Sequence, residues 1–301
     1  MYVCMCVYMY VFVGKKDSVY FPRNSLPKTV ERKICSVITI SFYNNKGGVA
    51  KTTSVVTTAS CLVQSGKRVL LVDVDPQANC SDAAGVYDGS EDKKTIFDLL
   101  MMGNRYDQLH FRNEINEVKC FSEELHCDVL ISNILLDGFQ DQIASSINRE
   151  YRLKKVLALL QQDYDFCLID CPPSLSLLSV NALVASNFVV IPCDSSKYAL
   201  TGMGNLIKKY HEIKDECNPE LSILGILNTK VDGRYTTAKT SREKLAEYFG
   251  DLLFDTFIPQ NAAVEKSQYE ALSLQAYDKN SPAYKSYKSF TKELLSRVEA
   301  W

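Results

Sequence analysis

The sequence has few of the residues that build metal centres and disulfide frameworks. Only three histidines and one tryptophan occur among its 301 residues, and none of the 11 cysteines forms a C-x-x-C pair. The histidines have no zinc-ligand spacing to the cysteines, several of which lie within apolar runs. This pattern argues against a zinc site and favours free thiols that pack as small apolar side chains in a reducing cytosol.

An excess of one charge and long apolar runs are absent as well. The 34 basic and 36 acidic residues leave a net charge of -2, which excludes a histone-like polycation but allows a local basic patch. The apolar stretch at residues 1–13 is shorter than the ~20 residues of a spanning helix and lacks the features of a secretory signal. We expect residues 1–34 to be a disordered appendage without stable membrane insertion; a segment that touches a membrane is the alternative.

Residues 35–301 show no serine- and glycine-rich linker and no internal repeat. Apolar, β-branched runs alternate with amphipathic stretches, which predicts one α/β domain with a mostly parallel, doubly wound sheet covered on both faces. Residues 82–127 have the weakest pattern and are expected to form a helical insertion. The expected strands are residues 35–43, 68–74, 128–132, 166–171, 187–193 and 221–229, and the expected helices are residues 52–64, 149–161, 199–216, 236–249 and 282–298.

The strongest chemical signal lies where the first strand meets the first helix. Residues 44–53 read Asn-Asn-Lys-Gly-Gly-Val-Ala-Lys-Thr-Thr. A glycine-containing turn that enters a helix directs backbone N–H groups and the positive helix end at one point, and this geometry binds phosphate. The Lys51 ammonium can reach the β- and γ-phosphates of a nucleotide, and the Thr52 hydroxyl can ligate Mg²⁺.

This turn departs from a regular P-loop, because Asn45 and Ala50 stand where glycine is usual and a second lysine, Lys46, precedes the glycines. It resembles the deviant Walker A motif, K-G-G-x-G-K-T-T, of the ParA/MinD family. Residues 70–79, Leu-Leu-Val-Asp-Val-Asp-Pro-Gln-Ala-Asn, are similar to that family's D-x-D-P-Q-x-N motif, and residues 167–173, Cys-Leu-Ile-Asp-Cys-Pro-Pro, resemble its Walker B strand. The resemblance implies a P-loop NTPase fold and ATP hydrolysis with Mg²⁺, in a protein that partitions plasmids or chromosomes or positions other cargo.

The resemblance also assigns roles to residues. Lys51 and the amides of the loop would hold the phosphates, with Thr52 ligating Mg²⁺ and Asp170 supporting it. Asp73 would belong to the Mg²⁺ shell or have a structural role. The residues expected to bind the nucleotide are Lys46, Gly47, Gly48, Val49, Ala50, Lys51, Thr52 and Thr53 in the loop, with Thr229, Pro259 and Gln260 near the adenine.

Three residues are expected to be catalytic. Asp75 would position or activate the attacking water, and Lys51 would neutralise charge on the phosphates. Lys46 would reach the nucleotide of the partner subunit in an ATP-dependent sandwich dimer.

Partners follow from the same resemblance. We expect the dimer to bind DNA non-specifically, to be stimulated by a ParB-like centromere-binding protein, and to be cytoplasmic and associated with the nucleoid. The residues proposed to contact DNA are Arg234, Lys230 and Lys266.

Three alternatives remain open. A MinD-like protein would act on a membrane or a protein scaffold, but residues 290–301 carry two basic and two acidic side chains rather than a basic face. An iron–sulfur carrier on the same fold would need paired cysteines. A regulator that hydrolyses little is the third, because alanine at position 50 costs on the order of 1 kcal/mol if the loop requires a positive φ there.

Overall fold

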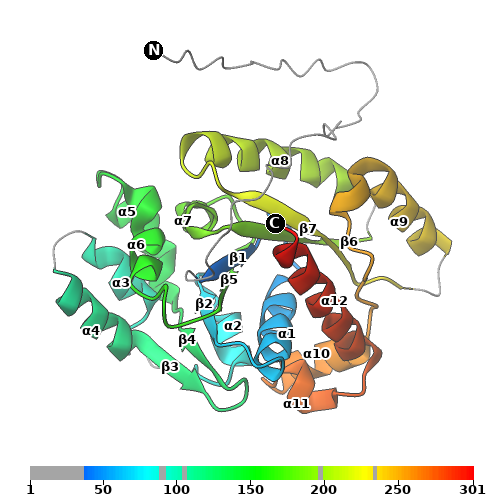
Figure 1. Ribbon diagram of the computed structural model, residues 1–301, viewed down its shortest axis with the longest axis horizontal. Coiled ribbons are helices and arrows are strands. Elements are labelled where there is room, and N and C mark those ends of the chain that lie inside the picture. The colour runs from blue at the N-terminus through cyan, green and yellow to red at the C-terminus, as the bar shows by residue number, and fades with distance from the viewer. Residues whose placement is uncertain (1–36, 88–92, 104–106, 196–198, 233–235) are drawn as a thin grey trace.

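The computed structural model describes residues 37–87, 93–103, 107–195, 199–232 and 236–301. The predicted appendage at residues 1–34 and the predicted DNA contact Arg234 lie outside the described residues. The described part forms one seven-stranded sheet with helices on both faces, so the predicted fold is confirmed (Figure 1). The strands are β1 (Ile38–Phe42), β2 (Val69–Asp73), β3 (Lys119–Ser122), β4 (Cys127–Leu130), β5 (Phe166–Asp170), β6 (Phe188–Asp194) and β7 (Ser222–Thr229).

The strand order brings three motifs to one edge of the sheet. The order is β3-β4-β2-β5-β1-β6-β7, and each neighbouring pair is parallel except β3 with β4. Asp170 at the end of β5 is in register with Phe42 of β1 on one side and Asp73 of β2 on the other. Ligands of open α/β sheets bind outside these carboxyl ends, so the topology places the phosphate loop and both acidic motifs in one crevice.

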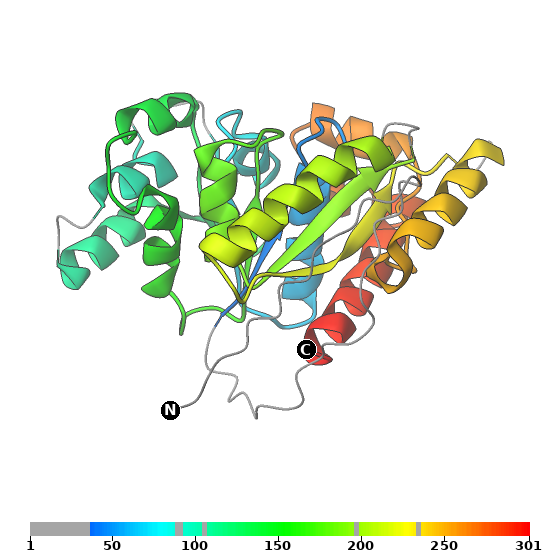
Figure 2. The same cartoon turned by 90° about the horizontal axis from the view of Figure 1, so that it is seen from above.

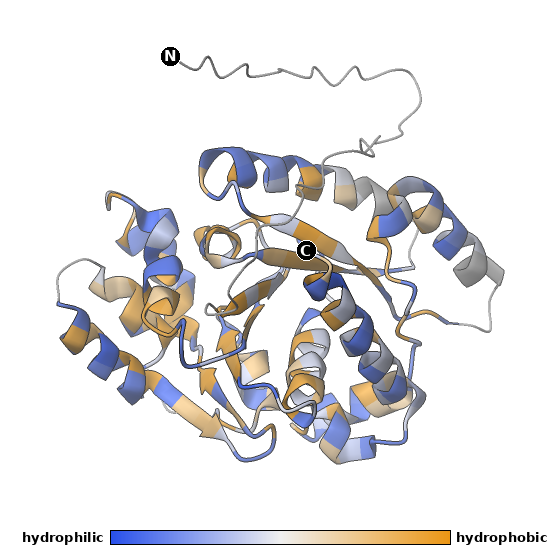
Figure 3. Cartoon of the chain, viewed as in Figure 1, coloured by the Kyte–Doolittle hydropathy of each residue, from blue (hydrophilic) through white to orange (hydrophobic). Residues whose placement is uncertain are grey.

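Helices cover the sheet in two layers, each with its own apolar core. One layer holds α1, α2, α11 and α12, and the other holds α3, α4, α6, α7, α8 and α9. Figure 2 shows α8 crossing in front of the strands, and Figure 3 shows the apolar residues concentrated in the strands and on the helix sides that face them. The helices are α1 (Lys51–Gln64), α2 (Asn79–Ala83), α3 (Ile96–Met102), α4 (Gln108–Val118), α5 (Phe139–Gln142), α6 (Arg152–Ala158), α7 (Leu177–Ala185), α8 (Ala199–Glu216), α9 (Thr236–Phe249), α10 (Ala262–Tyr269), α11 (Leu274–Asp278) and α12 (Pro282–Glu299), with short 3₁₀ turns at Ile134–Gly138, Arg149–Tyr151 and Gly250–Leu252.

Helix α12 packs against α1 and holds it in place. Its first turn is capped by Ser281, whose hydroxyl accepts a hydrogen bond from the Tyr284 amide at 3.2 Å, and Pro282 occupies the first helical position. The fully buried Tyr287 hydroxyl lies 3.0 Å from the Ser54 hydroxyl of α1. The apolar face of the C-terminal helix is therefore part of the core.

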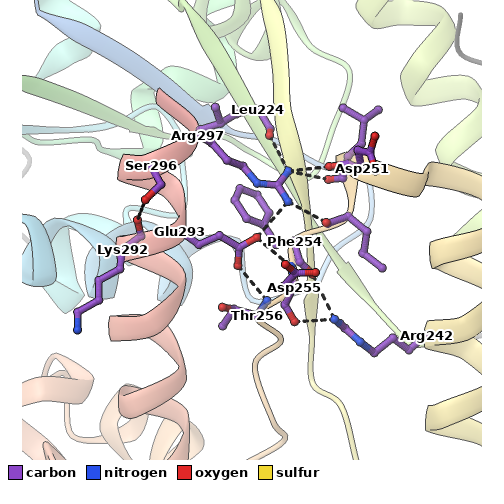
Figure 4. Close-up of polar contacts among 12 residues, drawn as sticks. Leu224, Arg242, Asp251, Phe254, Asp255, Thr256, Lys292, Glu293, Ser296 and Arg297 are labelled. Atoms are coloured by element: carbon purple, nitrogen blue, oxygen red, sulfur yellow. Dashed lines mark hydrogen bonds and ion pairs between the residues drawn. The ribbon is translucent and has the colours of Figure 1, made fainter. Parts of the chain in front are cut away.

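The C-terminal end of α12 also fastens the chain that leads into the site (Figure 4). The Arg297 guanidinium donates to four carbonyl oxygens, those of Leu224, Asp251, Leu252 and Leu253, and stands 4.0 Å from the centre of the Phe254 ring. The Glu293 carboxylate accepts hydrogen bonds from the Asp255 and Thr256 amides, both at 2.9 Å. These contacts fix the segment that continues into Ile258 and Pro259.

Two local predictions need correction or extension. Residues 82–127 are largely helical where described, as expected, but they end in the antiparallel strand β3, which the sequence pattern did not indicate. Helices α5, α7, α10 and α11 and the first residues of α2 were not predicted. The cysteines within the described ranges are free, and the helices in those ranges include none long and apolar enough to cross a membrane.

Candidate nucleotide-binding site

The loop between β1 and α1 is built to receive an anion. Gly48 and Ala50 have left-handed backbone conformations with φ of 73° and 62°, and Ala50 is the N-cap of α1. No side chain caps this helix end, and its first turn contains no acidic residue. Since successive N–H groups in such a turn point to one side and the helix end carries partial positive charge, the loop has the geometry of a phosphate cradle.

Two neighbouring strands hold the loop in place. The Asn44 side-chain amide donates to the Pro192 carbonyl oxygen of β6 at 2.8 Å, and its side-chain oxygen accepts from the Lys46 amide at 3.0 Å. The Thr229 hydroxyl of β7 donates to the Val49 carbonyl oxygen at 3.0 Å. Thr229, a predicted adenine contact, therefore lies behind the loop and braces it.

The two predicted lysines occupy different environments. Lys51 is buried, and its ammonium donates to the Lys46 carbonyl oxygen at 3.0 Å. Burial lowers the pKa of Lys51 from its usual value, although the nearby Asp170 and Asp75 carboxylates oppose that shift. Lys46 is 41% exposed and forms an ion pair with Asp194 at the end of β6, with 2.6 Å between Nζ and Oδ2.

Thr52 and Asp170 form the pair predicted to hold Mg²⁺. The Thr52 hydroxyl donates to Oδ2 of Asp170 at 2.7 Å, while Oδ1 of this fully buried carboxylate has no hydrogen-bond partner among the described residues. Burial, with the Asp73 carboxylate alongside, raises the pKa of Asp170 well above its usual range. A buried carboxylate with an unpaired oxygen beside a hydroxyl suits a hard divalent cation, so these residues fit Mg²⁺.

The two aspartates of the second motif differ in their surroundings. Asp73 is fully buried; its Oδ1 accepts from the Asp75 amide at 3.0 Å, and its Oδ2 accepts from the Ser81 amide at 2.8 Å and hydroxyl at 2.7 Å. Burial raises the pKa of Asp73 to about 7 even though these bonds oppose the shift. Of its two predicted roles, this bonding supports the structural one, in which Asp73 orients the turn that carries Asp75.

A cavity of about 410 Å³ joins these parts. Asp75 lines it together with residues of the loop, and so do Pro259 and Gln260, the predicted adenine contacts. Lys230, predicted to contact DNA, lines the same cavity, whereas Lys266 is exposed on α10. Gln268 was not predicted from the sequence; its side-chain amide donates to the Thr53 hydroxyl at 2.9 Å, and it lines the cavity from α10.

The sheet order, the uncapped loop and the Thr52–Asp170 pair define a P-loop nucleotide-binding protein. The AAA domain family matches residues 37–223. The chain is 35% identical over 257 residues to sporulation initiation inhibitor protein Soj of Bacillus subtilis, covering 85% of this chain and 98% of that protein. It is 34% identical over 269 residues to chromosome partitioning protein ParA of Myxococcus xanthus, covering 89% of each.

A solved structure agrees with these sequence matches. Cobyrinic acid a,c-diamide synthase from Mycobacterium smegmatis, with bound ADP and magnesium, has a TM-score of 0.74 and 28% identity, covering 88% of this chain and 96% of that one. The chain therefore belongs to the ParA/MinD family of P-loop ATPases.

Proposed function

We propose that the protein hydrolyses ATP and partitions plasmid or chromosomal DNA, through an ATP-dependent sandwich dimer that binds DNA non-specifically in the nucleoid. The observation that carries this proposal is one cavity lined by Lys51, Asp75 and the uncapped N-terminus of α1, where the Thr52 hydroxyl also donates a hydrogen bond to Asp170. A ParB-like DNA-binding protein would stimulate hydrolysis. The relatives named for chromosome partitioning support this assignment over other cargo.

Each residue of the site has a separate role in the proposed ATP hydrolysis. The loop amides and Lys51 bind the phosphates, and Lys51 must move from the Lys46 carbonyl oxygen to do so. Thr52 and Asp170 would hold Mg²⁺, which would supply charge neutralisation at the phosphates. Asp75, which lines the same cavity, orients the attacking water, and Asp73 keeps the Asp75 turn in place. Lys46 stabilises the charge that develops on the nucleotide of the partner subunit.

The first experiment separates binding from hydrolysis. Asp75→Ala should retain ATP affinity within about threefold while losing at least 100-fold in phosphate release, because water positioning is removed and the phosphate cradle remains. A fluorescent ATP analogue measures binding, and a phosphate assay measures turnover. Lys51→Ala, which removes the ammonium beside the phosphates, is the contrasting variant and should lose both. A collapse of ATP binding in Asp75→Ala would contradict the catalytic role of Asp75.

A MinD-like action on membranes receives less support from the structure. Such proteins use an exposed amphipathic C-terminal helix. Here Tyr284, Tyr287, Phe290 and Leu294 of α12 are buried in the core against the sheet and α1. We therefore propose that the protein acts on DNA and not on a membrane.

A further inference from the structure

Lys46 is held by its own chain in this structure. Its ammonium lies 2.6 Å from the Asp194 carboxylate, and the side chains are 41% and 20% exposed. Under the proposed function the same ammonium must reach the nucleotide of a partner subunit, so the contact with Asp194 has to break before Lys46 can act.

The fold places Asp194 at this position. The pairing of strand β6 with β1 ends at Val190, which is opposite Phe42. Strand β6 then continues for four more residues along the loop to Asp194. Asp194 is the register partner of Thr229 in β7. These two strand ends contact the loop side by side, Thr229 at the Val49 carbonyl oxygen and Asp194 at the Lys46 ammonium.

The other lysine is engaged in a comparable way. Lys51 donates to the Lys46 carbonyl oxygen, so both ammonium groups of the loop bind oxygens of their own chain. We propose that Asp194 is a positioning residue: it retains Lys46 in cis and thereby opposes dimer formation until nucleotide phosphates in a second copy of the chain compete for Lys46. This inference rests on the proposed function, in which Lys46 acts in trans.

The expected size of the effect follows from the exposure of the pair. An ion pair at a protein surface shifts an equilibrium by about 1.4- to 5-fold. A symmetric dimer breaks two such pairs, so removal of the Asp194 charge should tighten the dimer about 2- to 30-fold. The ratio of the dimer dissociation constants with and without the Asp194 charge should decrease as salt is added, because salt screens exposed charges.

The test uses the full chain with Asp75→Ala, so that ATP persists, and measures the dimer dissociation constant with ATP and Mg²⁺ by analytical ultracentrifugation. Asp194→Asn, nearly the same in shape, should tighten the dimer, and Asp194→Glu, which restores the carboxylate, should stay near the parent. Asp165→Asn is the matched control, because it removes an exposed ion pair with Arg68 at the opposite edge of the sheet, 3.0 Å between Nη2 and Oδ1. It should leave the dimer unchanged.

A second readout separates the retention of Lys46 by Asp194 from the trans role of Lys46. At protein concentrations below dimer formation, ATP affinity should be the same with and without Asp194→Asn. A dimer that Asp194→Asn leaves unchanged or weakens overturns the retention of Lys46, as does a change in monomer ATP affinity. A dimer that survives Lys46→Ala overturns the trans role itself. Should Asp194→Asn fail to fold, Asp194→Ser carries the same expectation.

Discussion

Ala50 has a backbone conformation that suits glycine. Its φ of 62° and ψ of 35° are left-handed, and the side chain of an L-residue there crowds the following carbonyl oxygen. The cost predicted for alanine at position 50 depends on a positive φ, and Ala50 has one. Ala78, the N-cap of α2 within the second motif, is left-handed as well with a φ of 53°.

Ala50→Gly should therefore raise the free energy of unfolding by about 1 kcal/mol, since glycine adopts this conformation without the steric cost. Urea titration followed by circular dichroism measures the change. The control is Ala246→Gly at an exposed position inside α9, where the same exchange should lower the free energy of unfolding by about 1 kcal/mol. Destabilisation by Ala50→Gly would show that the loop is not strained at this residue.

At the scale of elements, the junction of β7 with α12 depends on one glycine. A Cβ atom on Gly225 would lie 2.5 Å from the Phe254 ring, 2.8 Å from the Arg297 guanidinium and 2.9 Å from the Leu252 carbonyl oxygen. Gly225→Ala should lower the free energy of unfolding by about 1–3 kcal/mol through overpacking. Gly204→Ala in α8, where a Cβ meets nothing within 4 Å, should instead raise it by about 1 kcal/mol. Thermal melts of both variants make the comparison, and equal shifts would contradict the predicted crowding.

The Glu293 contact in the same junction predicts a pH dependence. Burial acts to raise the pKa of Glu293, but the Thr256 and Asp255 amides and Arg297 lower it overall. A pKa lowered by folding adds stability above the unfolded value of about 4.3, and that stability is lost as the pH falls through the folded value. Glu293→Gln should therefore cost about 1–2 kcal/mol at pH 7, and the difference from the parent should shrink below about pH 4. Denaturant titrations across this range provide the measurement, and a difference independent of pH would contradict the assigned contacts.

The elements that the sequence predicted best are those whose pattern is local. Ala199–Glu216 and Thr236–Phe249 match their expected bounds because long helices with one polar face show a clear period. Helix α7 was missed because Leu177–Ala185 is buried on nearly all sides and shows no such period. Strand β3 was missed because its four residues form a short, partly exposed edge.

The site divides in the same way. The loop and each of the two acidic motifs are single continuous stretches of sequence, so their residues could be predicted from local pattern. Asp194 contacts Lys46 across 148 positions and Gln268 contacts Thr53 across 215, and no local pattern reports such pairs. The function of Thr229 as a brace for the loop likewise depends on β7 lying beside the phosphate cradle.

At the scale of the whole molecule, the proposed DNA binding would have to come from local charge, because the net charge is only -2. Helix α10 connects the nucleotide cavity to a basic side chain: Asn261 caps its start and lines the cavity, and Lys266 is exposed further along the same helix. A sandwich dimer would present two copies of this surface, so a patch that is too weak in one chain becomes bivalent. Nucleotide state and DNA affinity should therefore be coupled.

We predict ATP-dependent, salt-sensitive DNA binding that ignores sequence, because the contacts are to phosphates. Lys266→Ala and Arg234→Ala should each weaken binding equally on two unrelated duplexes and reduce the slope of log affinity against log salt by about 1 per lysine or arginine removed. Lys94→Ala is the control, since the Lys94 ammonium is 2.7 Å from both Glu114 and Glu117, away from α10, and its loss should leave DNA affinity unchanged. Gel shifts with ATP, ADP and no nucleotide, at low and moderate salt, measure all three variants. Binding that is the same in every nucleotide state, or absent at low salt, would remove DNA as the partner and leave a membrane or a protein scaffold as the surface on which this protein acts.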